Sequence, residues 1–382
     1  MKKLLLFLIM PFFTACTPSA PKMQTVYEIN IDSISEALPE LAQIKYVPLE
    51  TTDSSLIGNI DKILYQNNKY YILDKVEKKI LVFDRKGKAM QIIHKVGQGP
   101  GEYLEPSDID IDKEGNIYVY DWATQSIITY KNGKPENYEI LKIGQYFLDF
   151  AMTDKYIFLS NILQENSFKI SLALWDKKKN EMRILKNNER IEGNKLAYRA
   201  NHYFYRSANI VTYYERFYPY IYQIDNDSIK YFTNLLTKKI PTKDEVEQWS
   251  QGTPSEQFMK SMQYVGDISA CYETEKYIFI TIQGMPPGYG IINKENNQTY
   301  YMPTHKYKNM PNGGAIATTG KEFISYMIPT EDNIQQILSS VTDTEKQLQI
   351  KSLDEESNPI LVLFSYKSVS YTHLRAHETL MN

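Results

Sequence analysis

Apolar and polar residues alternate in short segments along most of the chain, and turn-forming residues separate these segments. Residues 60–93 contain four such segments, with Gln-Asn-Asn and Arg-Lys-Gly at two of the junctions. Residues 108–130 repeat the plan, with Glu-Gly-Asn at the first turn. A period of two is typical of strands that bury one face, so the pattern predicts antiparallel strands joined by tight turns.

Looser copies of this unit follow along the chain. They occupy residues 147–162, 208–232, 267–282 and 314–327. Four short strands in a unit that recurs six times, at intervals of about 40 to 60 residues, predict an all-β fold, a six-bladed β-propeller of four-stranded antiparallel blades. The length of the repeat varies, so counting strands alone does not exclude a propeller of seven blades.

Helical periodicity is confined to three segments, residues 242–251, 255–265 and 331–341, which we expect to be short inserts between strands. The segment TVYEINI, residues 25–31, alternates like a strand. We expect it to join the last blade and close the ring, because closure protects the edges of a sheet.

The glycine-rich segment KVGQGPGEY, residues 95–103, invites comparison with a phosphate-binding loop. Such a loop needs Gly-Lys-Ser/Thr leading into a helix, but here Glu102 and Tyr103 follow the last glycine. Pro100 and Pro106 also oppose a helix. The sequence therefore predicts a tight connection between the outer strand of one blade and the inner strand of the next.

The N-terminus has the features of a secretory signal: two lysines, an apolar run and small residues before Cys16. The apolar run is shorter than the roughly 20 residues that span a bilayer as a helix. We expect a signal peptide over residues 1–15, a lipidated Cys16 and a flexible spacer over 16–24. The alternative is an ordinary signal with an incidental cysteine.

Composition further limits the classes of protein to which the chain can belong. A net charge of −3 gives no electrostatic basis for nucleic-acid binding. The second cysteine is Cys271, so lipidation of Cys16 would leave no intramolecular disulfide. Tyrosine is abundant, with 31 residues against 15 Phe. Tyrosine suits half-buried strand surfaces first and polar ligand sites second.

The glycine segment and the strands around it resemble a known family. GQGPGEY followed by DIDIDKEGNIYVYD, and preceded by YVPLETTDSSLIGNIDKI, is similar to the six-bladed β-propeller lipoproteins of Bacteroidota, relatives of the NHL-repeat propellers. The resemblance runs from about residue 25 to about residue 367 and implies the propeller fold over residues 25–368. It implies little about function, because one fold hosts many functions.

Candidate metal and catalytic motifs are incomplete. Asp108, Asp110 and Asp112 imitate the start of a calcium loop, but Lys113 stands where an EF-hand has glycine. His373 and His377 lack the glutamate of a zinc protease helix. A Gly-x-Ser-x-Gly nucleophile turn is absent from the sequence. We therefore expect no metal site, cofactor or catalytic residue, and favour binding over catalysis.

The densest polar-aromatic cluster lies in residues 198–220, with Trp122 as a further candidate at the mouth of the channel. Arginine side chains can donate two parallel hydrogen bonds to one anionic group, and tyrosine rings can pack against a ligand. Together they suit an anionic sugar or a peptide carboxylate. The predicted ligand-binding residues are Arg199, His202, Tyr203, Tyr214, Arg216 and Trp122. In the alternative interpretation, these tyrosines pack between blades and the arginines pair with neighbouring acids.

These observations predict a monomeric, lipid-anchored protein of the cell envelope, on the periplasmic side or the outer surface. Its partner would be a glycan, a peptide or an envelope protein. The alternative is an extracytoplasmic lyase or hydrolase that uses channel residues, as some NHL-type propellers do. Residues 369–382 resemble translated sequencing-adapter DNA, so we expect a non-native tail there.

Overall fold

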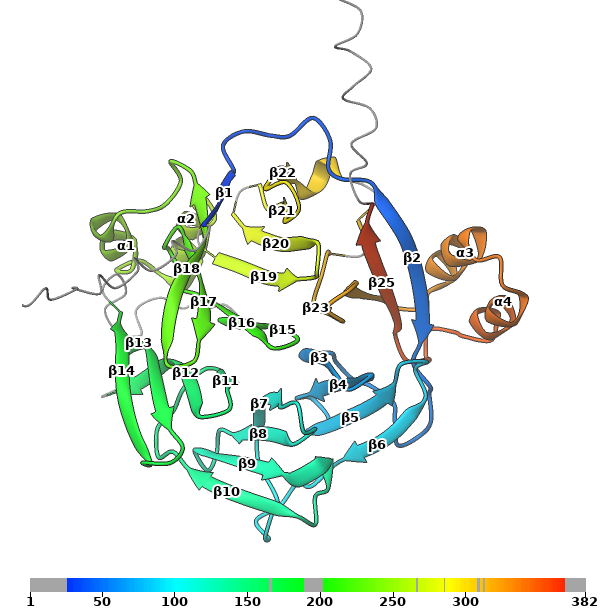
Figure 1. The fold of residues 1–382 in the computed structure, drawn as a ribbon, viewed down its shortest axis with the longest axis horizontal. Coiled ribbons are helices and arrows are strands. Elements are labelled where there is room, and N and C mark those ends of the chain that lie inside the picture. Colours follow the sequence, from blue (N-terminus) through cyan, green and yellow to red (C-terminus); the bar gives the residue numbers. More distant parts are fainter. Residues whose placement is uncertain are drawn as a thin grey trace, which may run out of the picture.

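The computed structural model describes residues 26–164, 167–188, 202–265, 267–284, 286–307, 310–311 and 313–367. They form six antiparallel sheets arranged as the blades of a ring. Figure 1 looks down this ring, with the first strand of each blade nearest the centre. The prediction of a six-bladed propeller with four-stranded blades is confirmed.

From the centre outward, the strands of blades 1, 2, 3 and 5 follow one another in the chain, and so do the first four of blade 4 and the first three of blade 6. Blades 1 to 3 contain β3 (Lys62–Gln66), β4 (Lys69–Asp74), β5 (Lys79–Asp84), β6 (Ala89–Ile93), β7 (Pro106–Ile111), β8 (Ile117–Asp121), β9 (Ser126–Tyr130), β10 (Tyr138–Lys142), β11 (Phe150–Met152), β12 (Tyr156–Gln164), β13 (Ser167–Asp176) and β14 (Glu181–Asn187). Blades 4 to 6 contain β15 (Phe204–Ser207), β16 (Ile210–Tyr214), β17 (Tyr220–Asp225), β18 (Ser228–Leu236), β19 (Asp267–Glu273), β20 (Tyr277–Gln283), β21 (Gly288–Asn293), β22 (Thr299–Pro303), β23 (Ala317–Thr318), β24 (Phe323–Met327) and β25 (Ile360–Tyr366).

The ring is closed by β2 (Leu41–Pro48), which pairs antiparallel with β25 as the outer strand of blade 6. The expectation that residues 25–31 would close the ring is wrong. β1 (Tyr27–Asn30) instead runs parallel to β18 as a fifth strand of blade 4. The physical reason is packing: Ile29 is fully buried and lies against Gly290 of blade 5, where the missing side chain leaves room for it.

Helices occur as inserts, as predicted for three segments. They are α1 (Lys243–Trp249), α2 (Pro254–Ser261), α3 (Glu331–Ser340) and α4 (Thr344–Lys351). The sequence did not predict α4, which packs with α3 outside the ring beside β2 (Figure 1). Across the described ranges, no helix is long and apolar enough to span a membrane.

The glycine-rich segment connects β6 to β7, as predicted. The Glu102 carboxylate accepts the Gly99 N–H at 2.7 Å, and the Glu102 N–H donates to the Gly99 carbonyl at 3.1 Å. Gly101 has φ of +72°, a conformation that residues with a Cβ rarely adopt. Its missing side chain also lets the ring of Tyr138 lie directly against the backbone.

Hydrophobic side chains fill the spaces between neighbouring blades. Between blades 1 and 2, for example, Leu73 and Ile80 pack with Ile109 and Val119 in one buried cluster. Buried tyrosines add hydrogen bonds to this packing, because each hydroxyl needs a partner once it leaves water. Tyr205 of blade 4 donates to the Ile268 carbonyl of blade 5 at 2.8 Å.

We expect Gly101→Ala to lower the free energy of unfolding more than Gly144→Ala does. Both glycines have positive φ, 72° and 70°, so each substitution costs about 1–2 kcal/mol of backbone strain. A Cβ at Gly101 would lie 2.7 Å from the Tyr138 ring, whereas nothing lies within 4 Å at Gly144. The overlap should add about 1–3 kcal/mol. Urea denaturation of both variants measures the difference, and equal losses would show that the Tyr138 contact is unimportant.

Candidate functional site

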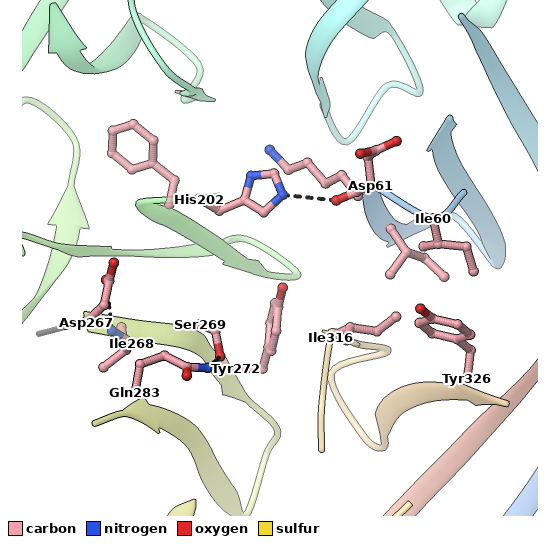
Figure 2. Close-up of a pocket in the computed structure, with 13 residues that line it drawn as sticks. Ile60, Asp61, His202, Asp267, Ile268, Ser269, Tyr272, Gln283, Ile316 and Tyr326 are labelled. Carbon is pink, nitrogen blue, oxygen red and sulfur yellow. Dashed lines mark hydrogen bonds between the residues drawn. The ribbon is translucent and has the colours of Figure 1, made fainter. Parts of the chain in front are cut away.

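A pocket of about 390 Å³ opens where four inner strands begin, at one end of the central channel. Residues at or just before β3, β15, β19 and β23 reach it, so blades 1, 4, 5 and 6 all contribute. Its lining residues are Ile60, Asp61, Lys62, Ile63, His202, Phe204, Asp267, Ile268, Ser269, Tyr272, Gln283, Ile316 and Tyr326. Figure 2 shows His202 across from Asp61 and, below them, Tyr272 and Tyr326 on either side of Ile316.

His202 stands at one wall of this pocket with a fixed tautomer. Its Nε2 lies 3.0 Å from the Asp61 carbonyl oxygen, which can only accept, so Nε2 carries the proton (Figure 2). Burial, with a smaller contribution from the Lys62 ammonium, lowers the pKa of His202 to about 4. The ring is therefore neutral at neutral pH. Its buried Nδ1 has no hydrogen-bond partner among the described residues and offers an unused acceptor.

Asp267 faces the same pocket and holds its proton unusually tightly. Burial raises the pKa of its carboxyl to about 7, and the Arg216 guanidinium opposes this only in part. Arg216 Nε lies 3.9 Å from Oδ2, while Oδ1 accepts the Ile268 N–H at 2.9 Å. Near neutral pH the acid is thus divided between its neutral and ionised forms.

Buried ionic contacts hold the pocket wall in place. Lys62 donates to Asp108 Oδ1 at 2.7 Å, which joins blade 1 to blade 2. Asp149 Oδ2 accepts the N–H groups of Tyr203 and Phe204 at 2.7 and 3.1 Å. Burial first, and then the neighbouring Asp108, raises the pKa of Asp149. The segment that carries His202 is thereby fastened to blade 3.

Comparison with known proteins places the chain in a family. Residues 27–365 match the family described as "Domain of unknown function (DUF4934)". The chain belongs to this family. No curated protein matches it.

Two solved structures share the fold of this DUF4934 propeller. A "Putative exported protein" from Bacteroides fragilis is 19% identical, with a TM-score of 0.69 over 90% of this chain and 99% of the other. A member of the duf4221 family from Bacteroides vulgatus is 12% identical, with a TM-score of 0.52 over 86% and 99% of the two chains. At these identities the likeness shows the architecture alone.

The residues predicted to bind a ligand are dispersed in the DUF4934 propeller. His202 lines the channel pocket, and Arg216 is 4% exposed and lies behind Asp267 without lining it. Tyr203 and Tyr214 are buried within blade 4, because alternate residues of its strands face the neighbouring blades. Arg199 and the proposed lipidation site Cys16 lie outside the described residues.

Trp122 lies apart from this pocket. It follows β8 and packs half-buried against Tyr120 and Tyr146. The backbone N–H of Trp122 donates to the Glu105 carbonyl at 2.9 Å, so Trp122 belongs to the connection at the beginning of blade 2. The structure therefore places it on the same face as the pocket, but in the packing of another blade.

The aspartates that imitate a calcium loop have other partners in the DUF4934 propeller. Asp108 pairs with Lys62, and Asp110 forms a two-pronged ion pair with Arg206. Asp112 accepts the Asn116 N–H and the Tyr118 hydroxyl, both at 2.8 Å. In the part of the chain that the structure describes, no three His, Cys, Asp or Glu side chains are grouped as metal ligands. The histidines 373 and 377 fall outside that part.

Sequence reasoning missed most of the residues that line the pocket, including Asp61, Asp267, Tyr272, Gln283 and Tyr326. Four of these residues lie in or beside the first two strands of blades 1 and 5, as Asp61 precedes β3 and Asp267 begins β19. The signal that could have found them is their place in the repeat. Polar residues at the start of successive inner strands must meet around the channel.

Asp267 and His202 should affect pH-dependent stability in opposite directions. The raised pKa of Asp267 makes unfolding easier as pH rises from about 4 to about 7, because the folded state keeps a proton that the unfolded state releases. The lowered pKa of His202 has the opposite effect between about 4 and 6.5, because the unfolded state then binds the extra proton. The two contributions largely cancel in the wild type.

Single substitutions should therefore reveal each contribution. Relative to wild type, Asp267→Asn should gain stability as pH rises from about 4 to 6.5, and His202→Gln should lose it, by up to about 1.4 kcal/mol per pH unit. Urea denaturation across this range measures both slopes. Curves parallel to the wild type would show that neither group has a shifted pKa in the folded protein.

Proposed function

We propose that this protein is a lipid-anchored propeller of the cell envelope that binds a glycan segment in the channel pocket. The N-terminal signal and the segment around Cys16 support export and anchoring, and the "Putative exported protein" of Bacteroides fragilis with the same fold is consistent with them. The binding proposal rests on one observation: two tyrosine side chains and several hydrogen-bonding groups from different blades line a single pocket at the channel mouth.

The chemistry of the lining suits a sugar better than a charged small molecule. Sugars present apolar ring faces together with hydroxyl groups, and aromatic side chains with a few placed polar groups match both. Gln283 Nε2 donates to Ser269 Oγ at 2.7 Å, which orients an amide and a hydroxyl at one side of the pocket. His202 is neutral, and Lys62 is already paired with Asp108. A ligand would thus meet a neutral imidazole, an amide and a hydroxyl group, together with the carboxyl groups of Asp61 and Asp267, which accept hydrogen bonds from sugar hydroxyl groups.

The pocket volume limits what can enter. About 390 Å³ lies at the lower end of the range for small-molecule sites, which is about 300–1,000 Å³. This space accommodates one or two sugar rings or the end of a longer chain. Because the pocket opens at the channel mouth, the remainder of a glycan would extend over the face formed by the connections between blades.

A second candidate function follows from the unusual acid and base in the same pocket. A neutral His202 with a free Nδ1 acceptor can take a proton, and a partly protonated Asp267 can give one. Such a pair of groups with shifted pKa values is typical of acid–base catalysis. The alternative proposal is therefore a glycan lyase or hydrolase that uses these two residues.

Binding is tested with Tyr326→Ala combined with Gln283→Ala. Any glycan identified by array screening should bind this variant at least tenfold more weakly in calorimetry, since about 1.4 kcal/mol is tenfold in affinity. The matched control is Tyr231→Ala, which removes a tyrosine that is 52% exposed on β18, outside the pocket lining. Unchanged affinity in the pocket variant, or binding of peptides in place of glycans, would contradict the proposal.

Catalysis is distinguished from binding by Asp267→Asn and His202→Gln. If the protein is an enzyme, these variants should bind the glycan but release at least a hundredfold less product, since a placed acid or base contributes about 10²–10⁴ to the rate. Reducing-end and ultraviolet assays detect hydrolytic and lyase products. A wild type that binds the glycan without changing it would exclude this alternative for that ligand.

A further inference from the structure

A second, larger cavity lies at the opposite end of the inner strands. It is a groove of about 890 Å³ between blade 6, blade 1 and the α3–α4 pair. Asn68, which lines it, follows the end of β3, whereas Asp61 of the channel pocket precedes the beginning of that strand. The turns after β5 and β23 and one side of β2 complete the groove, and Figure 1 shows α3 and α4 outside the ring beside β2.

The groove is basic although the whole chain is acidic. Five basic and three acidic side chains line it, against a net charge of −3 for the chain. Lys45 pairs with Glu322 at 2.7 Å. The other four cations have no carboxylate partner among the described residues: Arg85, Lys86, Lys321 and Lys346.

The acidic residues in the groove are fewer than the cations, and two of them, Glu322 and Asp343, have other partners. The carboxylate of Asp343 caps α4 and accepts the backbone N–H of Lys346 at 2.8 Å. Lys346 is half-buried, and this burial lowers the pKa of its ammonium despite the nearby Asp343. A cation that is partly removed from water without an ion pair is stabilised by any anion that reaches it.

Aromatic and amide groups accompany the charges. Tyr65 is half-buried beside Tyr70, with ring centroids 5.1 Å apart, and both residues line the groove. Gln43 and Asn68 add amide groups, and Asn68 Oδ1 accepts the Tyr65 hydroxyl at 3.2 Å. This combination matches a ligand that carries both anionic groups and ring faces.

We propose that this groove binds an acidic oligosaccharide, whose carboxylate or sulfate groups contact Arg85, Lys86, Lys321 and Lys346. The guanidinium of Arg85 can bind such a group through two parallel hydrogen bonds, and the three ammonium groups act as point charges. Tyr65 provides the aromatic contact for a sugar ring. A flat bilayer surface does not enter a concave groove between two blades, so the shape favours a chain over anionic lipid. This site is separate from the channel pocket and does not depend on the function proposed for it.

The test uses defined probes on the full chain. Calorimetry at low salt measures binding of a galacturonate oligosaccharide and a sulfated heparin oligosaccharide, with a dextran oligosaccharide of equal length as the neutral probe. The wild type should bind at least one acidic probe and not the neutral one. Raising the salt concentration should weaken this binding, because exposed ionic contacts are screened.

Two matched variants locate the site. Arg85→Gln, Lys86→Gln, Lys321→Gln and Lys346→Gln together should weaken binding at least tenfold. The control replaces four exposed lysines on other blades and inserts, namely Lys178, Lys179, Lys243 and Lys260, by Gln and removes the same charge. The control should change affinity less than twofold, and thermal melting verifies that both variants fold.

Several outcomes would overturn the proposal. These are absence of binding by either acidic probe, an equal loss in both variants, or tighter binding of a poly-glutamate peptide or of phosphatidylglycerol vesicles than of the oligosaccharides. The double variant of Tyr326 and Gln283 should leave binding at the groove unchanged. This measurement distinguishes failure of the groove proposal from failure of the channel-pocket proposal.

Discussion

Blades 2, 3 and 4 are joined beside the channel by carboxylates that accept backbone N–H groups from the neighbouring blade. The innermost strand of each blade is an edge strand, and among the described residues no further strand pairs with its channel side. Asp108 and Asp110 of blade 2 accept the N–H groups of Phe150 and Met152 of blade 3 at 3.0 and 2.7 Å. Asp149 does the same for Tyr203 and Phe204 of blade 4. Unpaired N–H groups in a buried channel would each be costly, so these contacts also set the spacing of the blades.

This arrangement accounts for charged groups that lie close together at the channel, where no three His, Cys, Asp or Glu side chains of the described residues are grouped as metal ligands. Asp108 and Asp110 each accept a backbone N–H group and pair with one cation, Lys62 for Asp108 and Arg206 for Asp110. Asp267 differs, since its nearest cation, Arg216, is 3.9 Å away and one of its oxygens has no hydrogen-bond partner within the described ranges. An oxygen without a hydrogen-bond partner thus belongs to a residue that lines the pocket, where a ligand can supply a partner.

The fold could be predicted from the sequence because its signals are local. Alternation along each strand and the turn residues between strands determine a blade, and repetition determines the ring. Closure could not be predicted, because β1 and β2 are both short alternating segments, and packing of Ile29 against Gly290 decides which blade receives β1. α4 was missed because its sequence, TEKQLQIK, buries only Ile350 and so lacks an apolar stripe.

The site could be predicted only in part because its contacts are distant in sequence. Asp110 and Arg206 are 96 positions apart, and the pocket unites residues between positions 60 and 326. His202 was identified from its polar and aromatic neighbours in sequence. Most of those neighbours are buried between blades, because both faces of a blade pack against adjacent blades. Local composition therefore identified a segment that contributes to the pocket, but not which of its side chains line the pocket.

Hydrogen exchange tests most directly whether carboxylates hold the inner strands and the pocket wall. The substitution is Asp149→Ala, with Asp176→Ala as control, because Asp176 accepts two backbone N–H groups at 2.9 and 3.0 Å in an exposed turn. Asp149→Asn, which keeps the shape and one acceptor, serves if the alanine variant does not fold. We expect Asp149→Ala to speed exchange selectively at Tyr203 and Phe204, and Asp176→Ala to affect only its own turn. Unchanged protection at Tyr203 and Phe204 would contradict the account.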